Sequence, residues 1–93
     1  MCVSETISVE LTIKNLYGLH ARAAAKLVKA ANSYQSEIRV VKGDDIADAR
    51  SVVSLISLGC AYDSRIVIEA EGVDAQSAVT ALSSIVEERF GEE

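Results

Sequence analysis

The chain has 93 residues, of which 49% are hydrophobic and 25% charged, and its formal net charge is −5. A chain of this length can bury one core, so residues 1–93 are expected to form a single domain, and the acidic balance argues against a nucleic-acid partner. The start of the sequence shows no signal pattern and its apolar runs are short, which predicts a cytoplasmic protein without a membrane partner.

The first half of the chain alternates between strand and helix patterns. Residues 7–14 alternate apolar and polar side chains and predict a half-buried strand. Residues 21–32 place apolar side chains at helical spacing and are rich in Ala, which predicts an amphipathic helix. Residues 37–42 and 46–49 predict two further strands, joined by a turn at residues 43–45.

The second half continues with a short helix, a strand and a long helix. Ser51 is a good N-cap residue, and it precedes a helical pattern at residues 52–58 that Gly59 ends. Residues 65–71 predict a fourth strand, and Asp74 is a natural N-cap for a helix that runs to about Phe90. The order βαββαβα favours an α+β fold, a two-layer open-faced sandwich whose four-stranded antiparallel sheet is covered on one face by helices.

The only histidine, His20, stands where the first strand pattern changes into the first helix pattern, just after Gly18. A helix start offers unpaired N–H groups and a partial positive charge, so it can bind a phosphate or another anion. The helix start and the nearby Arg22 disfavour a cationic imidazole, which leaves a neutral nucleophile that could carry a phosphoryl group. A structural or incidental role for a lone histidine remains the alternative from the residues alone.

Residues 11–36 contain no Asp or Glu, and four cations fall there, namely Lys14, Arg22, Lys26 and Lys29. Three of them, Arg22, Lys26 and Lys29, lie on one stripe of the predicted helix, beginning beside His20. A basic face on an acidic protein suggests docking to an acidic partner or handling of an anion. A solvated helix face explains Lys26 and Lys29 about as well.

The two cysteines, Cys2 and Cys60, and one histidine are too few for a disulfide framework or a zinc set, so we predict no metal site and no cofactor. Cys60 is interpreted as a small buried hydrophobic residue, and Cys2 as part of a mobile terminus.

The string Gly18-Leu-His-Ala-Arg-Ala-Ala24 resembles the active-site signature of the HPr family, the histidine-containing phosphocarriers of the phosphoenolpyruvate-dependent sugar phosphotransferase system. The string Arg50-Ser-Val-Val-Ser-Leu-Ile-Ser-Leu-Gly59 is similar to the second signature of that family. Residues 66–72 resemble its last strand. The element order predicted above is also that of the family.

The resemblance implies that His20 accepts a phosphoryl group on Nδ1 from phosphorylated enzyme I and hands it to an enzyme IIA domain, while Arg22 steadies the phosphate. The chain would then be a phosphotransfer carrier rather than a stand-alone catalyst. Ser51 matches the serine that an HPr kinase/phosphorylase modifies in many members. Docking residues implied by the family are Val53 and Ile56 on the short helix, ringed by Lys26, Lys29 and Arg50, with Leu58 in the core.

One residue departs from the family pattern, because Ala23 stands where the family usually has Pro. Ala leaves one more free N–H in the first turn, which puts the rate or lifetime of the phosphohistidine in doubt. Two alternative functions stay open. One is a regulatory module, of the nitrogen-related branch or controlled through Ser51, that acts by docking; the other is a metabolite-binding α+β domain.

Overall fold

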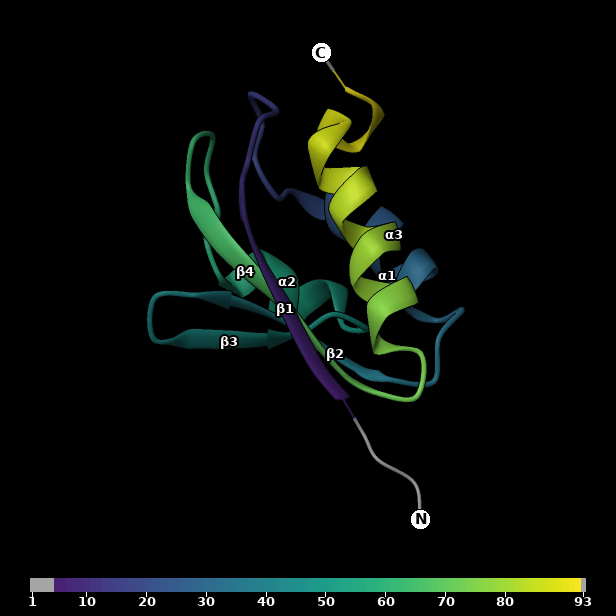
Figure 1. The fold of residues 1–93 in the computed structure, drawn as a ribbon. Helices are drawn as coiled ribbons and strands as arrows, with labels where there is room; N and C mark the ends of the chain where they lie inside the picture. Colours follow the sequence, from purple (N-terminus) through teal and green to yellow (C-terminus); the bar gives the residue numbers. More distant parts are fainter. Residues whose placement is uncertain (1–4, 93) are drawn as a thin grey trace.

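The computed structural model describes residues 5–92, so the expectation for Cys2 lies outside the described part. Its elements follow the predicted order (Figure 1): β1 (Glu5–Thr12), α1 (Ala21–Ala31), β2 (Glu37–Lys42), β3 (Asp45–Asp48), α2 (Val52–Ser57), β4 (Arg65–Gly72), α3 (Ala75–Glu87) and a 3₁₀ turn, η1 (Arg89–Gly91). Among the helices in residues 5–92, none has the length and apolar character needed to cross a bilayer.

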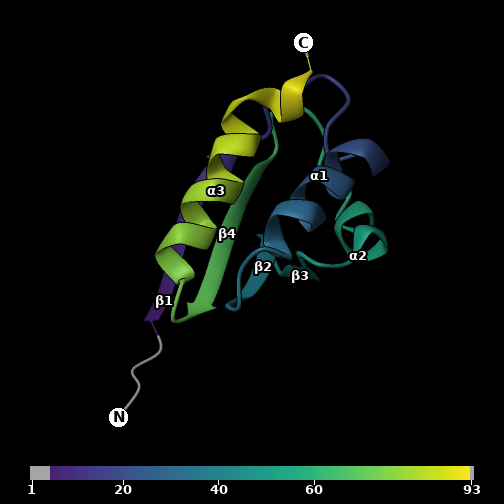
Figure 2. The same cartoon turned by 90° about the vertical axis from the view of Figure 1, so that its right-hand side faces the viewer.

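The four strands form one antiparallel sheet in the order β1-β4-β2-β3. Within it, β4 is central: Val9 of β1 and Val40 of β2 both pair with Ile68. The helices α1 and α3 lie on the same side of this sheet, as the two perpendicular views show (Figures 1 and 2). The prediction of a two-layer open-faced sandwich is therefore confirmed.

The core fills the space between the sheet and the helices. Its largest side chains, each at most 1% exposed, are Phe90, Ile13, Leu27, Ile38, Leu55, Ile66, Ile68 and Leu82. Burial of each such side chain contributes about 1.5–3 kcal/mol to folding. Cys60 is 4% exposed and burial raises the pKa of its thiol, which confirms the interpretation of this residue as a small core side chain.

The N-terminal cap of α2 follows the sequence prediction. Ser51 has an extended backbone and its Oγ accepts a hydrogen bond from the N–H of Ser54 at 3.1 Å. In α1 the first intrahelical bond runs from the N–H of Ala24 to the carbonyl of His20 at 2.8 Å. Ala23 is fully buried in this first turn, so the helix forms with Ala at the position where the family usually has Pro.

The prediction for the last helix is confirmed for the position of its N-cap, Asp74, and wrong in two details. Asp74 occupies the N-cap position of α3, but its carboxylate makes no bond to that helix and accepts instead from the backbone N–H groups of Gln35 and Ser36, at 2.8 and 2.9 Å. The helix also ends at Glu87 rather than near Phe90, because Phe90 adopts a left-handed conformation with φ of 55°. Phe90 is 1% exposed, and its carbonyl accepts from the Lys26 ammonium of α1.

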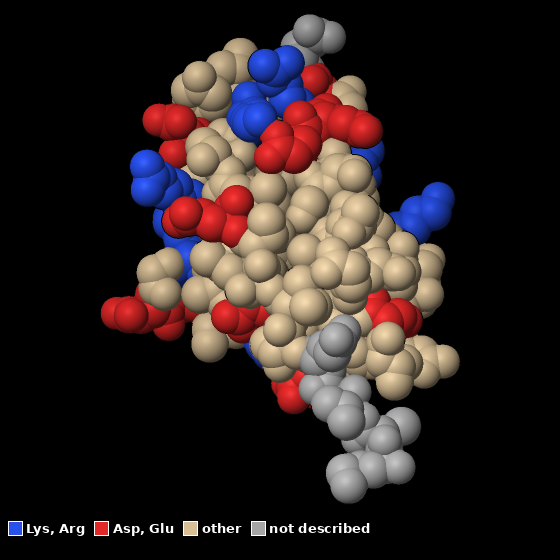
Figure 3. All heavy atoms as spheres, viewed as in Figure 1, with Lys and Arg blue, Asp and Glu red and all other residues tan. Residues whose placement is uncertain are grey.

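The outer surface of α3 is largely uncharged. Its exposed positions include Gln76, Ser77, Thr80 and Ser84, and the charged side chains lie mostly at the rim of this face (Figure 3). Lys14 and Glu87 form an ion pair at one end of this helix.

Candidate functional site

The loop before α1 is held against the segment that connects α2 to β4. The N–H of Leu19 donates to the carbonyl of Cys60 at 2.8 Å, and the N–H of Gly18 donates to the carbonyl of Asn15 at 3.2 Å. Gly18 has a φ of +67°, and a Cβ at this position would lie 2.4 Å from the Cys60 carbonyl oxygen. Only glycine fits this close approach, which fixes where the next residues enter the helix.

His20 is the N-cap residue of α1. Its backbone is extended, with φ of −89° and ψ of −179°, and its side chain turns back so that Nδ1 accepts from the N–H of Arg22 at 3.3 Å. The imidazole is 28% exposed. The predicted location of His20 at a helix start is confirmed, and the ring is both anchored by the backbone and open to solvent.

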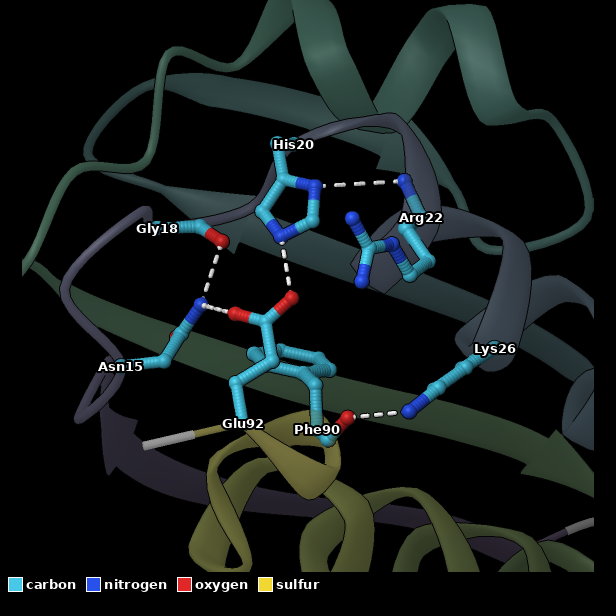
Figure 4. Close-up of polar contacts among 7 residues, drawn as sticks. All are labelled: Asn15, Gly18, His20, Arg22, Lys26, Phe90 and Glu92. Atoms are coloured by element: carbon cyan, nitrogen blue, oxygen red, sulfur yellow. Dashed lines mark hydrogen bonds and ion pairs between the residues drawn. The ribbon is translucent and has the colours of Figure 1, made fainter.

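The other ring nitrogen of His20 contacts an acid from the far end of the chain. Nε2 lies 2.5 Å from Oε2 of Glu92, and Oε1 of the same carboxylate accepts from Nδ2 of Asn15 at 2.9 Å (Figure 4). The hydrogen bond from Asn15, followed by the contact with His20, holds the pKa of Glu92 below its ordinary value against an opposing effect of burial. The carboxylate is therefore ionised over the neutral pH range.

These two contacts define the tautomer of the ring. A nitrogen that accepts a backbone N–H carries no proton, whereas a nitrogen facing a carboxylate donates one. The neutral form with its proton on Nε2 satisfies both contacts, and we assign that tautomer to His20 from the hydrogen-bond geometry. Nδ1 then carries no proton, and its electron pair accepts the hydrogen bond from the N–H of Arg22 at the N-terminus of α1.

Arg22 lies beside His20 at a shallow depression in the surface. Arg22 is exposed and its guanidinium points toward the space between the His20 ring and the Glu92 carboxylate (Figure 4). Leu16, Tyr17, Gly91 and Glu92 line a shallow depression together with His20 and Arg22. The Tyr17 ring meets the imidazole edge-on, with the ring centroids 6.1 Å apart. Of the predicted residues, His20 and Arg22 are thus brought together around one open depression.

Two cations of the predicted docking set make internal contacts. The Lys26 ammonium donates to the carbonyl of Phe90. The Arg50 guanidinium donates to the carbonyls of Ala31 and Tyr34, at 3.0 and 2.5 Å, and so lies at the opposite end of α1 from His20. Lys29, in the last turn of α1, is exposed.

The apolar members of the predicted docking set lie on α2, which packs beside α1 (Figure 2). Val53 is 75% exposed and Ile56 is 42% exposed, whereas Leu58 is only 7% exposed and belongs to the core. Exposed aliphatic side chains on a short helix offer apolar area to a partner. Ser51, at the start of the same helix, is partly exposed and its hydroxyl is already used as the helix cap.

Sequence reasoning missed Asn15 and Glu92. Residues 11–36 contain no acid, so any carboxylate beside His20 had to come from another part of the chain, but no pattern in the sequence indicated which one. The C-terminal segment, where Phe90 is followed by Gly91 and Glu92, supplies it.

Comparisons with known proteins agree on one family. Residues 7–88 match the family model described as the PTS HPr component phosphorylation site. The phosphocarrier protein HPr of Cupriavidus necator is 36% identical over 83 residues, covering 89% of this chain and 93% of that protein. The phosphocarrier protein NPr of Shewanella violacea is 39% identical over 83 residues, covering 89% and 91%. A crystal structure of HPr from Thermoanaerobacter tengcongensis superposes with a TM-score of 0.89 at 39% identity, covering 94% of this chain and 98% of that one.

Proposed function

Because the chain belongs to the HPr family of phosphocarrier proteins, we propose that His20 accepts a phosphoryl group from phosphorylated enzyme I and passes it to an enzyme IIA protein. This transfer belongs to the phosphoenolpyruvate-dependent phosphotransferase system and takes place in the cytoplasm. The observation that carries the proposal is the unprotonated Nδ1 at the N-terminus of α1, whose only hydrogen bond among residues 5–92 is a long one of 3.3 Å from the N–H of Arg22 and is given up when the phosphoryl group arrives.

The reaction needs no proton transfer at the attacking atom. Nδ1 of neutral His20 attacks phosphorus, the new N–P bond forms, and the bond between phosphorus and the donor breaks with its electron pair returning to the donor. The phosphate then lies beside the first N–H groups of α1 and the Arg22 guanidinium, which donate charge-assisted hydrogen bonds to its oxygens. A helix N-terminus stabilises such a charge by about 0.3–1 kcal/mol, which is small enough for onward transfer.

Partner proteins would contact the surface that surrounds His20. The exposed side chains of Val53 and Ile56 supply the apolar part of this surface, and Arg22 and Lys29 supply positive charge. Lys26 and Arg50 would join it only after leaving the carbonyl groups that they contact. An acidic partner groove with an apolar floor fits this combination.

The test is phosphorylation in a defined mixture. The chain is incubated with enzyme I and labelled phosphoenolpyruvate, and the product is treated with acid and with alkali. We expect a label on His20 that acid removes and alkali leaves, and no label on His20→Ala, whose fold is checked by circular dichroism. An unlabelled wild-type chain in a mixture that labels a known HPr would refute the proposal.

A regulatory role is the second candidate function, and it is supported by the similarity of the chain to the NPr of Shewanella violacea. In this version docking to a partner, or phosphorylation of Ser51 by an HPr kinase/phosphorylase, is the function and transfer through His20 is dispensable. The discriminating variant is again His20→Ala. Partner control that survives this substitution supports the regulatory role, whereas its loss supports the carrier role.

A further inference from the structure

We propose that Glu92 is a positioning residue for phosphoryl transfer, which holds the proton of His20 on Nε2 before, during and after formation of the N–P bond. The proposal rests on the proposed carrier function, which supplies the reaction. It extends that function by assigning a task to a residue outside both signatures.

The carboxylate is held by the protein and does not move as a free surface side chain. Glu92 is 13% exposed, and its second oxygen accepts from Nδ2 of Asn15, a residue with no exposed surface. The same Nδ2 donates to the carbonyl of Gly18 at 2.7 Å. One amide group therefore ties the carboxylate to the loop that positions His20.

The orientation of Asn15 follows from these partners. Its NH₂ group faces two acceptors, so the amide cannot be reversed, and its Oδ1 stays buried without a hydrogen-bond partner among residues 5–92. A buried oxygen without a hydrogen-bond partner destabilises the fold. The same orientation of the amide directs its NH₂ group at the Glu92 carboxylate.

The backbone that delivers Glu92 is also fixed. Phe90 is 1% exposed, its left-handed φ of 55° turns the chain after α3, and its carbonyl accepts from the Lys26 ammonium of α1. Anchors on both sides of Gly91 thus bring the following carboxylate to the imidazole. The position of Glu92 is therefore fixed by the buried Phe90 ring and by the contact of that residue with α1, as expected for a group that orients another side chain.

The charge that develops on the His20 ring during the transfer explains why a carboxylate is placed beside it. When neutral His20 attacks through Nδ1, the ring keeps its Nε2 proton and becomes a positively charged N-phosphoimidazolium. The charged groups that face this ring are Glu92 from the segment after η1 and Arg22 from α1, and Tyr17 meets it edge-on. The Glu92 anion stabilises the positive ring, which remains a good leaving group. Breaking the N–P bond then returns the electron pair to Nδ1 and restores the original tautomer.

Replacement of Glu92 by Gln tests this role directly, because it places a hydrogen-bond donor where the carboxylate accepts from Nε2 of His20. The hydrogen bond from Asn15 would retain the Gln oxygen, so the Gln NH₂ group would face Nε2 and favour the tautomer with its proton on Nδ1. That tautomer has no electron pair at the attacking atom. Loss of the partner that orients a metal-binding histidine costs about 10- to 100-fold in affinity or activity. Glu92 orients the His20 ring through the same type of hydrogen bond, and we expect Glu92→Gln to be phosphorylated at least about tenfold more slowly than wild type.

Three variants separate this role from a structural one. Glu92→Ala removes the carboxylate without supplying a donor, so it should be slower than wild type but faster than Glu92→Gln. Glu88→Gln removes an equal charge from an exposed position nearby and should react as wild type. Nitrogen-15 NMR of the ring should show Nε2–H in wild type and a shift toward Nδ1–H in Glu92→Gln.

The outcomes distinguish the two proposals. A wild-type chain that enzyme I does not label refutes the carrier function, while the NMR measurement still tests the assignment of the tautomer. A labelled wild type together with a Glu92→Gln variant of equal rate and unchanged ring spectrum refutes the role of Glu92 and leaves the carrier function standing.

Discussion

The contact between Gly18 and the Cys60 carbonyl gives a quantitative test of how the loop before α1 is held. Gly18 and Gly59 both have left-handed backbones, with φ of +67° and +65°. A Cβ at Gly18 would lie 2.4 Å from the Cys60 oxygen and 3.0 Å from Cα of Ala61, whereas a Cβ at Gly59 would meet nothing within 4 Å. Replacing each glycine by Ala therefore separates the steric contact from the backbone conformation.

The magnitudes follow from these two terms. A left-handed conformation costs an alanine about 1–2 kcal/mol, and this applies to both variants. The overpacking at Gly18 adds about 1–3 kcal/mol, because its neighbours are backbone atoms that hold the loop and cannot swing aside. We expect Gly59→Ala to lower the free energy of unfolding by about 1–2 kcal/mol and Gly18→Ala by about 2–5 kcal/mol.

The assay is urea unfolding followed by circular dichroism, supported by thermal melts, in which each kcal/mol shifts Tm by roughly 4–8 °C for a domain of this size. The effect of alanine on the unfolded chain is the same in both variants and cancels in their difference. Equal losses of stability in the two variants, or a larger loss in Gly59→Ala, would refute the reasoning that backbone contact at Gly18 fixes the loop.

Three further predictions concern residues outside this loop. Arg50→Met should lower the free energy of unfolding by about 1–3 kcal/mol in urea melts, because the carbonyls of Ala31 and Tyr34 lose a charged donor. Unchanged stability would contradict the structural role of Arg50. Ser51→Ala should lower the free energy of unfolding by about 1 kcal/mol in the same assay. Ser51→Asp should lower it less, because Asp also caps a helix, so equal losses in the two variants would argue against the cap. For Asp74, the hydrogen bonds from Ser36 and Gln35 lower the pKa of the carboxyl in the folded state, so the stability it contributes is present above the unfolded pKa of about 3.9 and is lost as pH falls through the folded pKa. The difference in unfolding free energy between wild type and Asp74→Asn should therefore shrink in urea melts below about pH 4, and a constant difference down to pH 2 would contradict the assignment.

Features governed by neighbours in the sequence were predictable. The caps at His20 and Ser51 depend on bonds to residues two or three positions ahead, and the inward positions of Ile66 and Ile68 follow from the period of a strand. The signature around His20 also placed the histidine and Arg22 together. Such features are encoded within one or two helical turns.

Features that depend on distant partners were not predictable from the pattern. Asp74 has the side chain and position of an N-cap, yet its carboxylate serves the backbone before β2, because two N–H groups there lack other partners. Arg50 looked like a surface cation for docking, but it donates to the carbonyl of Ala31 in α1 and to that of Tyr34 in the following loop. Glu92 reaches His20 only because Phe90 is buried, and no local pattern distinguishes it from the other acids near it.

The order of strands in the sheet has a consequence for the order in which the chain can fold. β2 and β3 are joined by a two-residue turn at positions 43–44, so this hairpin closes a short loop, whereas β1 pairs with β4 from Glu5↔Gly72 to Thr12↔Arg65, across more than half the chain. Distant pairings form later, since closing a long loop costs more entropy than closing a short one. During synthesis β1 leaves the ribosome first, and it cannot pair until β4 has also been synthesised. The imidazole thus gains its contact with Glu92 only after nearly the whole chain has been synthesised.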